Sequence, residues 1–459
     1  MRVFKCLLVF LCFLGIYVTS GFAAEGIKFD FHGMMNQIIG STNNSLSLAG
    51  KHKSGKTDFF SYDGKLNSKG FNTKYINYYN SVGTTFGFSK AQLIFNAETE
   101  DNLAKLVYGL EVGTVNWGDS NKGFSLSGDG INQETRFVYA EIKAKKDNIK
   151  HIVRLGLQPT KISNWVWSET ASGLTYHGKT SKCKWMAGWY KGDEDASSNA
   201  KDNNYLVLKT EGELAPNFNI GLFAIYENAG SESTESYNYT KTNTYDRTNY
   251  YLGLTAELNP KPFFANFEFV YQGGDIDFIG ESNNIEDLNR RAFLMNIDAG
   301  IKVNKQLTLS FNTLYVSGDD NPNDNDAENF DAIDVDVKVG MILFKDSFIS
   351  KCDHFVSDAP YLLDKGLIHH ALMAKYMLNK KHSFFTAIRY MSTSEDIGNN
   401  ENSIGTELDF KYAYKLNKYV KLRFEAACLV PGGASDLMTI DDKEADTIFN
   451  IGSGIQFKF

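Results

Sequence analysis

The sequence contains no apolar run of 18 or more residues after its first two dozen positions. A membrane-spanning helix needs about 20 consecutive apolar residues, so this part of the chain has no helical membrane span. Such a chain can reside in a membrane only as a closed β-barrel, because a barrel also satisfies every backbone hydrogen bond internally. The choice therefore lies between a secreted soluble β-protein and a membrane barrel.

The sequence also has little proline and no excess of positive charge. Its 7 Pro, 39 Gly, 24 Tyr and 34 Phe, with a mean hydropathy of −0.31, are typical of a chain rich in strands and turns. The formal charge is −8, and loss of an N-terminal leader that holds Arg2 and Lys5 but no acidic residue leaves −10. Nucleic acid is therefore excluded as a partner, because its phosphates require a basic surface.

Cysteine is scarce and shows no metal-binding spacing. Two of the five cysteines lie in the first 24 residues, and Cys183, Cys352 and Cys428 are far apart, which allows either three unpaired thiols or one disulfide and one thiol. His369 and His370 are adjacent, so in a strand they point to opposite faces and make a poor metal pair. We therefore expect neither a metal nor another cofactor.

Neither calcium binding nor catalysis has a clear motif. The stretch from Asp319 to Glu328 is rich in oxygen ligands, but it has a central proline and lacks the loop glycine of an EF-hand. It is either a solvated acidic loop or a calcium site, and the first is the simpler interpretation. Catalysis by a barrel needs a Ser or Asp nucleophile beside a His, and the 8 His show no such spacing. We expect that the protein is not an enzyme.

The first 24 residues have the pattern of a secretory signal peptide. Arg2 and Lys5 precede an apolar run from Leu7 to Val18, and small residues follow it up to Ala24. The alternative is an N-terminal membrane anchor, but the run is shorter than the about 20 residues that a spanning helix needs. We expect residues 1–24 to be removed and residues 25–459 to form a single barrel domain.

The last twelve residues, Ile448 to Phe459, alternate between the two faces of a strand. Polar and glycine residues share one face, and the other face carries Phe449, Ile451, Ile455, Phe457 and Phe459. This stretch resembles the closing strand of a bacterial outer-membrane β-barrel, whose terminal aromatic residue the assembly machinery recognises. The resemblance implies that Phe457 and Phe459 form the membrane assembly signal.

A similar unit recurs along the chain: about ten alternating residues, a short turn, another run and a longer polar loop. Short turns on one rim and long loops on the other are typical of an outer-membrane barrel. The sequence therefore predicts an all-β, antiparallel transmembrane β-barrel with short periplasmic turns and long extracellular loops. We expect 18 strands, or 16 if two weak strands near 173–191 merge into loops. Long loops are expected near residues 40–80, 159–172 and 318–366.

One alternating stretch within the last of these loops does not fit the strand count. Residues from Ile333 to Met341 alternate between apolar and mostly charged side chains, as a strand does. The stretch is either an additional hairpin or a strand-like segment that folds over the mouth of the barrel.

Two stretches point to a narrower family. Leu103 to Gly118, which contains LVYGLEVGTVNWG, and Val153 to Pro159, which reads VRLGLQP, resemble the trimeric outer-membrane porins of sulfate-reducing bacteria and their relatives. The acidic segment after Gly318, with its FDAID, adds to the resemblance. It covers most of the mature chain in strand order and implies a homotrimer of water-filled barrels that contacts outer-membrane lipid, lipopolysaccharide and the barrel-assembly machinery. The acidic Pro-Glu-Phe-Gly-Gly motif of the general porins is absent.

In a porin, charged residues on the inner wall set the ion selectivity. Because the apolar side chains point outward, the alternation places positive and negative side chains on the lumen side in about equal number. The wall therefore predicts no strong ion preference. The net negative charge of the chain weakly favours cations. For any single inward charge, a solvated wall residue without a measurable effect on selectivity is the simpler interpretation. The pore-lining candidates are Arg154, Lys161, Glu169, Glu111, Glu268, Arg290, Arg389, Glu407, Asp409, Lys421, Arg423 and Glu425.

The loop near 159–172 is the candidate constriction, offering Lys161, Trp165, Trp167 and Glu169. Alternatively, the two Trp side chains anchor the barrel at the outer membrane interface or pack between subunits.

The sequence thus predicts a passive diffusion channel for small hydrophilic solutes and ions in the bacterial outer membrane. One alternative is a substrate-selective channel, with a row of aromatic or Arg side chains along the lumen. A second alternative is a surface adhesin or structural barrel that uses its long loops for attachment.

Overall fold

The computed structural model describes residues 26–44, 82–117, 133–146, 148–192, 203–232, 244–279, 287–321, 324–335, 337–343, 347–348, 361, 365–396, 400–437 and 447–459. The expected signal peptide, most of the loop expected at 40–80, and Cys352 lie outside these residues. Within the part of the chain that is described, no helix is both long and apolar enough to cross a membrane.

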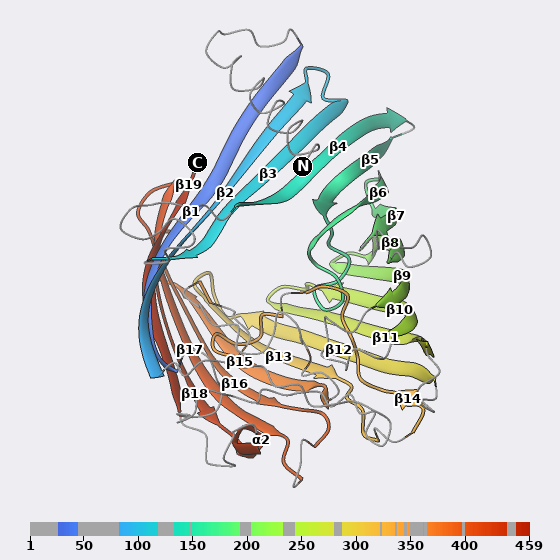
Figure 1. Cartoon of the computed structure of the whole chain (residues 1–459). Coiled ribbons are helices and arrows are strands. Elements are labelled where there is room, and N and C mark those ends of the chain that lie inside the picture. Colours follow the sequence, from blue (N-terminus) through green and yellow to red (C-terminus); the bar gives the residue numbers. More distant parts are fainter. Residues whose placement is uncertain are drawn as a thin grey trace.

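Eighteen long antiparallel strands form one closed barrel, which confirms the predicted fold class (Figure 1). The first nine are β1 (Ile27–Asn44), β2 (Val82–Thr99), β3 (Ala104–Asn116), β4 (Gln133–Lys146), β5 (Ile149–Pro159), β6 (Thr170–Lys179), β7 (Cys183–Lys191), β8 (Asn204–Ala215) and β9 (Phe218–Glu232). The others are β10 (Thr244–Leu258), β11 (Phe263–Ile279), β12 (Leu288–Lys302), β13 (Leu307–Val316), β15 (Leu367–Met377), β16 (His382–Ser392), β17 (Ser403–Lys415), β18 (Val420–Pro431) and β19 (Ile448–Lys458).

Two short elements lie between barrel strands. The two-residue strand β14 (Asp326–Ala327), between β13 and β15, pairs in parallel with β12. The helix α2 (Gly433–Leu437) follows β18. The two weak strands expected near 173–191 are β6 and β7, so the count of 18 holds. Because β6 begins at Thr170, the connection after β5 ends earlier than the predicted loop 159–172.

The ring closes between the first and last strands. The pairing of β1 with β19 runs from Met34 opposite Lys458 to Thr42 opposite Asn450. The last residue takes part, because the Gly33 N–H donates to the Phe459 carbonyl (2.9 Å) and the Phe459 N–H donates to the Gly33 carbonyl (3.1 Å). The Phe459 ring lies 5.5 Å from the Phe31 ring on the outer face. Over this register the first and last strands satisfy each other's backbone groups, as a bilayer requires.

Asparagine forms several of the short turns. Asn102, Asn148 and Asn217 adopt positive φ values of 58°, 64° and 65°. Asn tolerates this left-handed conformation because its short polar side chain can hydrogen-bond to the local backbone. These three positions lie between β2 and β3, β4 and β5, and β8 and β9, so local chemistry sets three of the tight turns.

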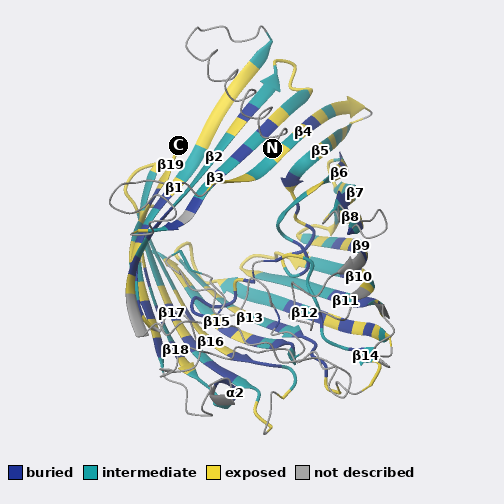
Figure 2. Cartoon of the chain, in the orientation of Figure 1, coloured by how far each residue is buried: buried dark blue, intermediate teal, exposed yellow. Residues whose placement is uncertain are grey.

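Burial follows the period of two along most strands (Figure 2). Apolar side chains that point outward are exposed, such as Leu155 (61%), Leu208 (63%) and Leu372 (61%). Their neighbours in sequence point into the barrel. An exposed apolar band around a closed barrel is the surface that lipid requires, in agreement with the predicted outer-membrane location.

We expect deletion of Phe459 to impair barrel assembly, since it removes two closing hydrogen bonds and the contact with Phe31. The yield of folded barrel, measured as the heat-modifiable band on a gel, should fall several-fold. Phe449→Ala removes an outward aromatic from the other end of β19 and serves as the control. An unchanged yield after deletion of Phe459 would show that closure does not depend on this residue.

Candidate functional site

Much of the inner wall is apolar, although the pore-lining residues predicted from the sequence are all charged. Val207, Ile225, Leu294, Leu314 and Leu429 point into the barrel and are at most 1% exposed. They belong to one cluster with residues from the connection between β13 and β15. In β8, β9, β12 and β13 apolar residues occur on both parities. Apolar residues on both faces of a strand can be seen in the sequence, and they indicate that both faces are covered.

The inner side of this cluster is covered by a lumen segment, defined here as residues 329–335, 337–343 and 347–348. Its apolar members Phe330, Val335, Val337, Met341 and Leu343 are buried. The alternating stretch Ile333 to Met341 is therefore not an additional barrel hairpin. It lies inside the barrel, packed against the wall, and not only over the mouth.

Hydrogen bonds attach the start of the lumen segment to β11, β12 and the end of β13. Arg290 donates to the Asn329 carbonyl (2.8 Å), and the Phe330 N–H donates to the Ser317 carbonyl (3.1 Å). The Asp331 N–H donates to Gln272 (2.8 Å). These three hydrogen bonds fix the point at which the segment leaves the wall.

The connection after β5 interlocks with the lumen segment. The Ile333 N–H donates to the Val166 carbonyl and the Ser168 N–H donates to the Asp334 carbonyl, each at 2.9 Å. Nearby, the Tyr361 hydroxyl donates to the Trp165 carbonyl (2.5 Å). Burial raises the pKa of Tyr361 well above its usual value, so the donating hydroxyl stays protonated. Two connections far apart in sequence therefore form one inward structure.

Trp167 fixes the β5–β6 connection to the wall. Its ring lies 5.0 Å from the Tyr190 ring and 4.8 Å from the Tyr205 ring, and only 4% of the residue is exposed. An anchor at the outer membrane interface is thus wrong for Trp167. Glu169 binds Arg136 (3.5 Å), which also approaches Glu111 (3.7 Å).

Two carboxylates on the opposite wall hold the far end of the lumen segment. Glu407 is fully buried and accepts hydrogen bonds from the backbone N–H groups of Met341, Ile342 (3.0 Å) and Leu343 (3.3 Å). Glu425 accepts from the Ser347 hydroxyl and the Phe348 N–H, both at 2.8 Å.

Arg423 also holds Phe348, next to the hydrogen bonds that Glu425 accepts. Its guanidinium lies 4.4 Å from the centre of the Phe348 ring, and it donates to Gln456 (3.2 Å). A cation over an aromatic face is favourable when both groups are partly removed from water. With Arg290 at the start of the segment, four of the predicted charged candidates therefore position it, the others being Glu407, Arg423 and Glu425.

Sequence reasoning missed an ionic cluster on β9 and β10. Arg247 binds Glu227 (2.7 Å) and Asp331 of the lumen segment (3.3 Å). Asn249 and Tyr251 also donate to Glu227, at 2.8 and 3.3 Å. Only the tertiary structure brings Asp331 to this wall, so no local pattern could have identified the cluster.

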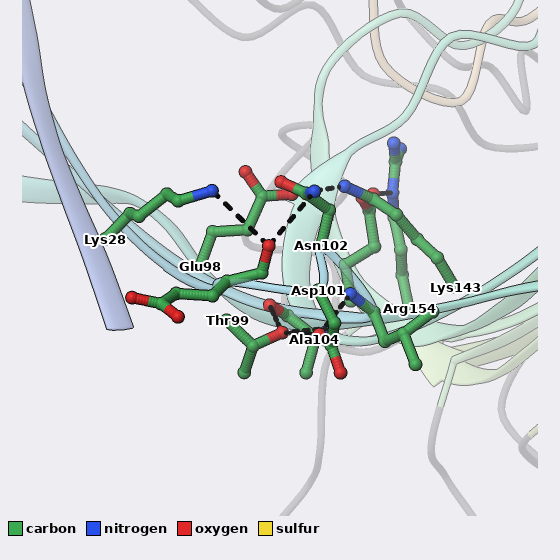
Figure 3. Close-up of polar contacts among 11 residues, drawn as sticks. Lys28, Glu98, Thr99, Asp101, Asn102, Ala104, Lys143 and Arg154 are labelled. Carbon is green, nitrogen blue, oxygen red and sulfur yellow. Dashed lines mark hydrogen bonds and ion pairs between the residues drawn. The ribbon is translucent and has the colours of Figure 1, made fainter. Parts of the chain in front are cut away.

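Other predicted residues pair along the wall. Arg154 donates to Glu141 (2.6 Å), and Lys143 links Glu141 (3.4 Å) to Glu98 (2.7 Å), forming a charge ladder across β2, β4 and β5 (Figure 3). Glu111 is buried against Lys90 (2.5 Å).

The turn beside the charge ladder is held by a local hydrogen-bond network (Figure 3). Asp101 accepts hydrogen bonds from the Thr99 hydroxyl (2.5 Å) and the Leu103 N–H (2.9 Å). Both hydrogen bonds lower the pKa of Asp101, and the one from Thr99 has the larger effect. The carboxylate that organises this turn is thus held in its charged form.

The remaining candidates lie on β11, β16, β17 and β18 and in the connection after β5. Arg389 donates to Asp409 (2.6 Å) and lies 3.5 Å from His369. Glu268 accepts a hydrogen bond from the Ser163 hydroxyl. Lys161 is exposed, and Lys421 lies on the inner face of β18. The roles of all twelve candidates in selectivity stay predictions.

A cavity of about 1090 Å³ lies beneath the inward structure. It is lined by the β5–β6 connection, the β6–β7 turn, strands β8 to β13, β15 and β16, and Lys338 of the lumen segment. Lys161, Glu268, Asp298 and Arg389 face it together with the amide groups of Asn266 and Asn296. Charged and amide groups around such a volume suit a hydrated solute.

No metal site is found in the described part of the chain, since no three His, Cys, Asp or Glu side chains come together suitably. Cys183 and Cys428 are free thiols.

The comparisons with known proteins concern the fold. No protein-family model matches the chain, and no curated protein matches it by sequence. OccK9 (OpdG) of Pseudomonas aeruginosa is 11% identical over 95% of this chain and 99% of that chain, with a TM-score of 0.52. OpdK of the same species, solved with vanillate, is 8% identical over 94% and 98%, with a TM-score of 0.51. The chain shares their barrel architecture, which is that of an outer-membrane porin.

We expect Glu407→Ala to release the lumen segment, because three buried backbone N–H groups lose their acceptor at about 1–3 kcal/mol each. Trypsin should then cleave after Lys338 much faster than in the unchanged protein. Glu213→Ala, an exposed acid at the end of β8, is the control. Equal cleavage rates in both variants would mean that Glu407 does not hold the segment.

Proposed function

We propose that the chain is an outer-membrane porin that lets small hydrophilic solutes and ions diffuse through a water-filled lumen. The observation that carries this proposal is the closed barrel narrowed, but not filled, by two interlocked inward segments. The cavity of about 1090 Å³ beneath them is lined by charged and amide groups. A structural barrel has no need for a polar cavity bounded by a fixed constriction.

The same proposal includes the environment of the barrel. Residues 1–24 direct export, Phe457 and Phe459 contact the barrel-assembly machinery, and the outward apolar band contacts outer-membrane lipid and lipopolysaccharide. We further propose a homotrimer related to the porins of sulfate-reducing bacteria, as the stretches Leu103 to Gly118 and Val153 to Pro159 suggest. Chemical cross-linking in membranes tests the trimer directly.

A second candidate is a substrate-selective channel. It is favoured by the hydrogen bonds that hold the constriction in one conformation, because a fixed opening can discriminate by shape and charge. OpdK, which shares this barrel architecture, was solved with vanillate, a small organic solute. A conductance that saturates with one solute class would separate this candidate from a passive channel.

We expect purified protein to produce large ohmic current steps in a planar bilayer. Replacing residues 332–341 by a short Gly-Ser linker should raise the single-channel conductance several-fold, because it removes the lumen segment from the pore. Phe459 is retained in this variant, so assembly is preserved and can be checked by the gel shift. A folded barrel without current steps would contradict the channel and favour an adhesin or structural barrel.

A further inference from the structure

The rim formed by the short turns carries a cluster of lysines on one side of the barrel. The turns after β12, β15 and β17 contain no Asp or Glu within 302–307, 378–382 and 415–419. This is notable in a chain of net charge −8. The lysines are exposed and form no ion pair with a described residue: Lys302, Lys305, Lys380, Lys381, Lys415 and Lys418.

The three turns are neighbours in space as well as in composition. Strand β13 pairs with β15, β15 with β16 and β16 with β17, so the turns follow one another around the rim. Six positive charges therefore lie along one arc of the barrel without compensating carboxylates. Such a surface attracts anions.

An apolar groove of about 690 Å³ lies on the outer face of the same strands. Leu309 of β13 is paired with Ala374 of β15, and Ala374 is paired with Thr386 of β16. Across these three strands, a large side chain is therefore followed by two small ones. Leu372 and Ile388, one row further from the rim, are 61% and 48% exposed and border the groove. The small side chains of Ala374 and Thr386 form its floor.

A row of aromatic side chains separates the groove from the lysines. Tyr376, Phe384 and Tyr412 lie two residues closer to the rim than the groove floor and are paired across β15, β16 and β17. The ring of Phe384 is 6.4 Å from that of Tyr376 and 5.0 Å from that of Tyr412. Aromatic rows of this kind mark the boundary between hydrocarbon and headgroups.

We propose that this arc of the barrel binds an anionic diacyl phospholipid of the periplasmic leaflet. The order from groove to aromatic row to lysines matches the order from acyl chain to interface to phosphate in such a lipid. The lysine ammonium groups hold the phosphate, and an acyl chain lies over Ala374 and Thr386. The inference rests on the membrane placement in the proposed function, but not on channel activity.

The test is native mass spectrometry of the full barrel from nanodiscs with equal amounts of phosphatidylglycerol and phosphatidylethanolamine. The unchanged protein should retain phosphatidylglycerol in several-fold excess. K305Q/K380Q/K381Q should reduce that retention at least about fivefold, the effect of losing one lysine contact. K145Q/K146Q/K150Q removes three exposed lysines from the β4–β5 turn region and should retain the lipid fully. Ala374→Phe fills the groove and should reduce retention of both lipids.

Several outcomes would overturn the proposal. Equal retention of the two lipids by the unchanged protein, or equal losses in both triple variants, would show that the rim attracts anions without a specific site. Displacement of the lipid by millimolar inorganic phosphate would indicate a free-anion site. A change in oligomer mass for Ala374→Phe without loss of lipid would assign the groove to a second copy of the chain. Selective retention by a barrel that does not conduct would support this inference and contradict the channel.

Discussion

Backbone hydrogen bonding in an apolar environment is the constraint on which the rest of this structure depends. With no water to satisfy an unpaired N–H or C=O in hydrocarbon, the eighteen strands must close into a ring. The pairing of β1 with β19, which extends to Phe459, meets this demand. Closure also creates two faces with different environments, and the alternation of side chains along each strand follows from it.

The interior of the barrel has two different characters. The wall formed by β2 to β5 presents paired charges, such as Arg154 with Glu141 and Lys90 with Glu111. Much of the remaining wall is apolar and is covered by the lumen segment. The lumen segment buries apolar surface inside the barrel, which gives the constriction a small hydrophobic core of its own. The position of the lumen segment therefore depends on packing as well as on hydrogen bonds.

Buried carboxylates determine where the lumen segment lies. Removing a carboxylate from water is costly, and the cost is offset only when several donors surround it. Glu407, Glu425 and Glu227 each receive two or more hydrogen bonds or ion pairs from the segment or from the wall beside it. The rim lysines differ, since they remain exposed and are available to lipid headgroups. The charges of this protein thus act structurally within the lumen and as a binding surface outside it.

The sequence by itself determined the fold class, the strand count to within two and the outward face of β19, because these depend on local alternation and turn residues. It also assigned Glu407, Asp409 and Glu425 to the inner face, since parity alone decides the side of a strand. Only the tertiary structure decided what these residues touch. Glu407 meets Met341 and Arg247 meets Asp331 across 66 and 84 positions of sequence. Contacts at such separation depend on the path of a connection through the barrel, and that path is set by packing against many strands at once.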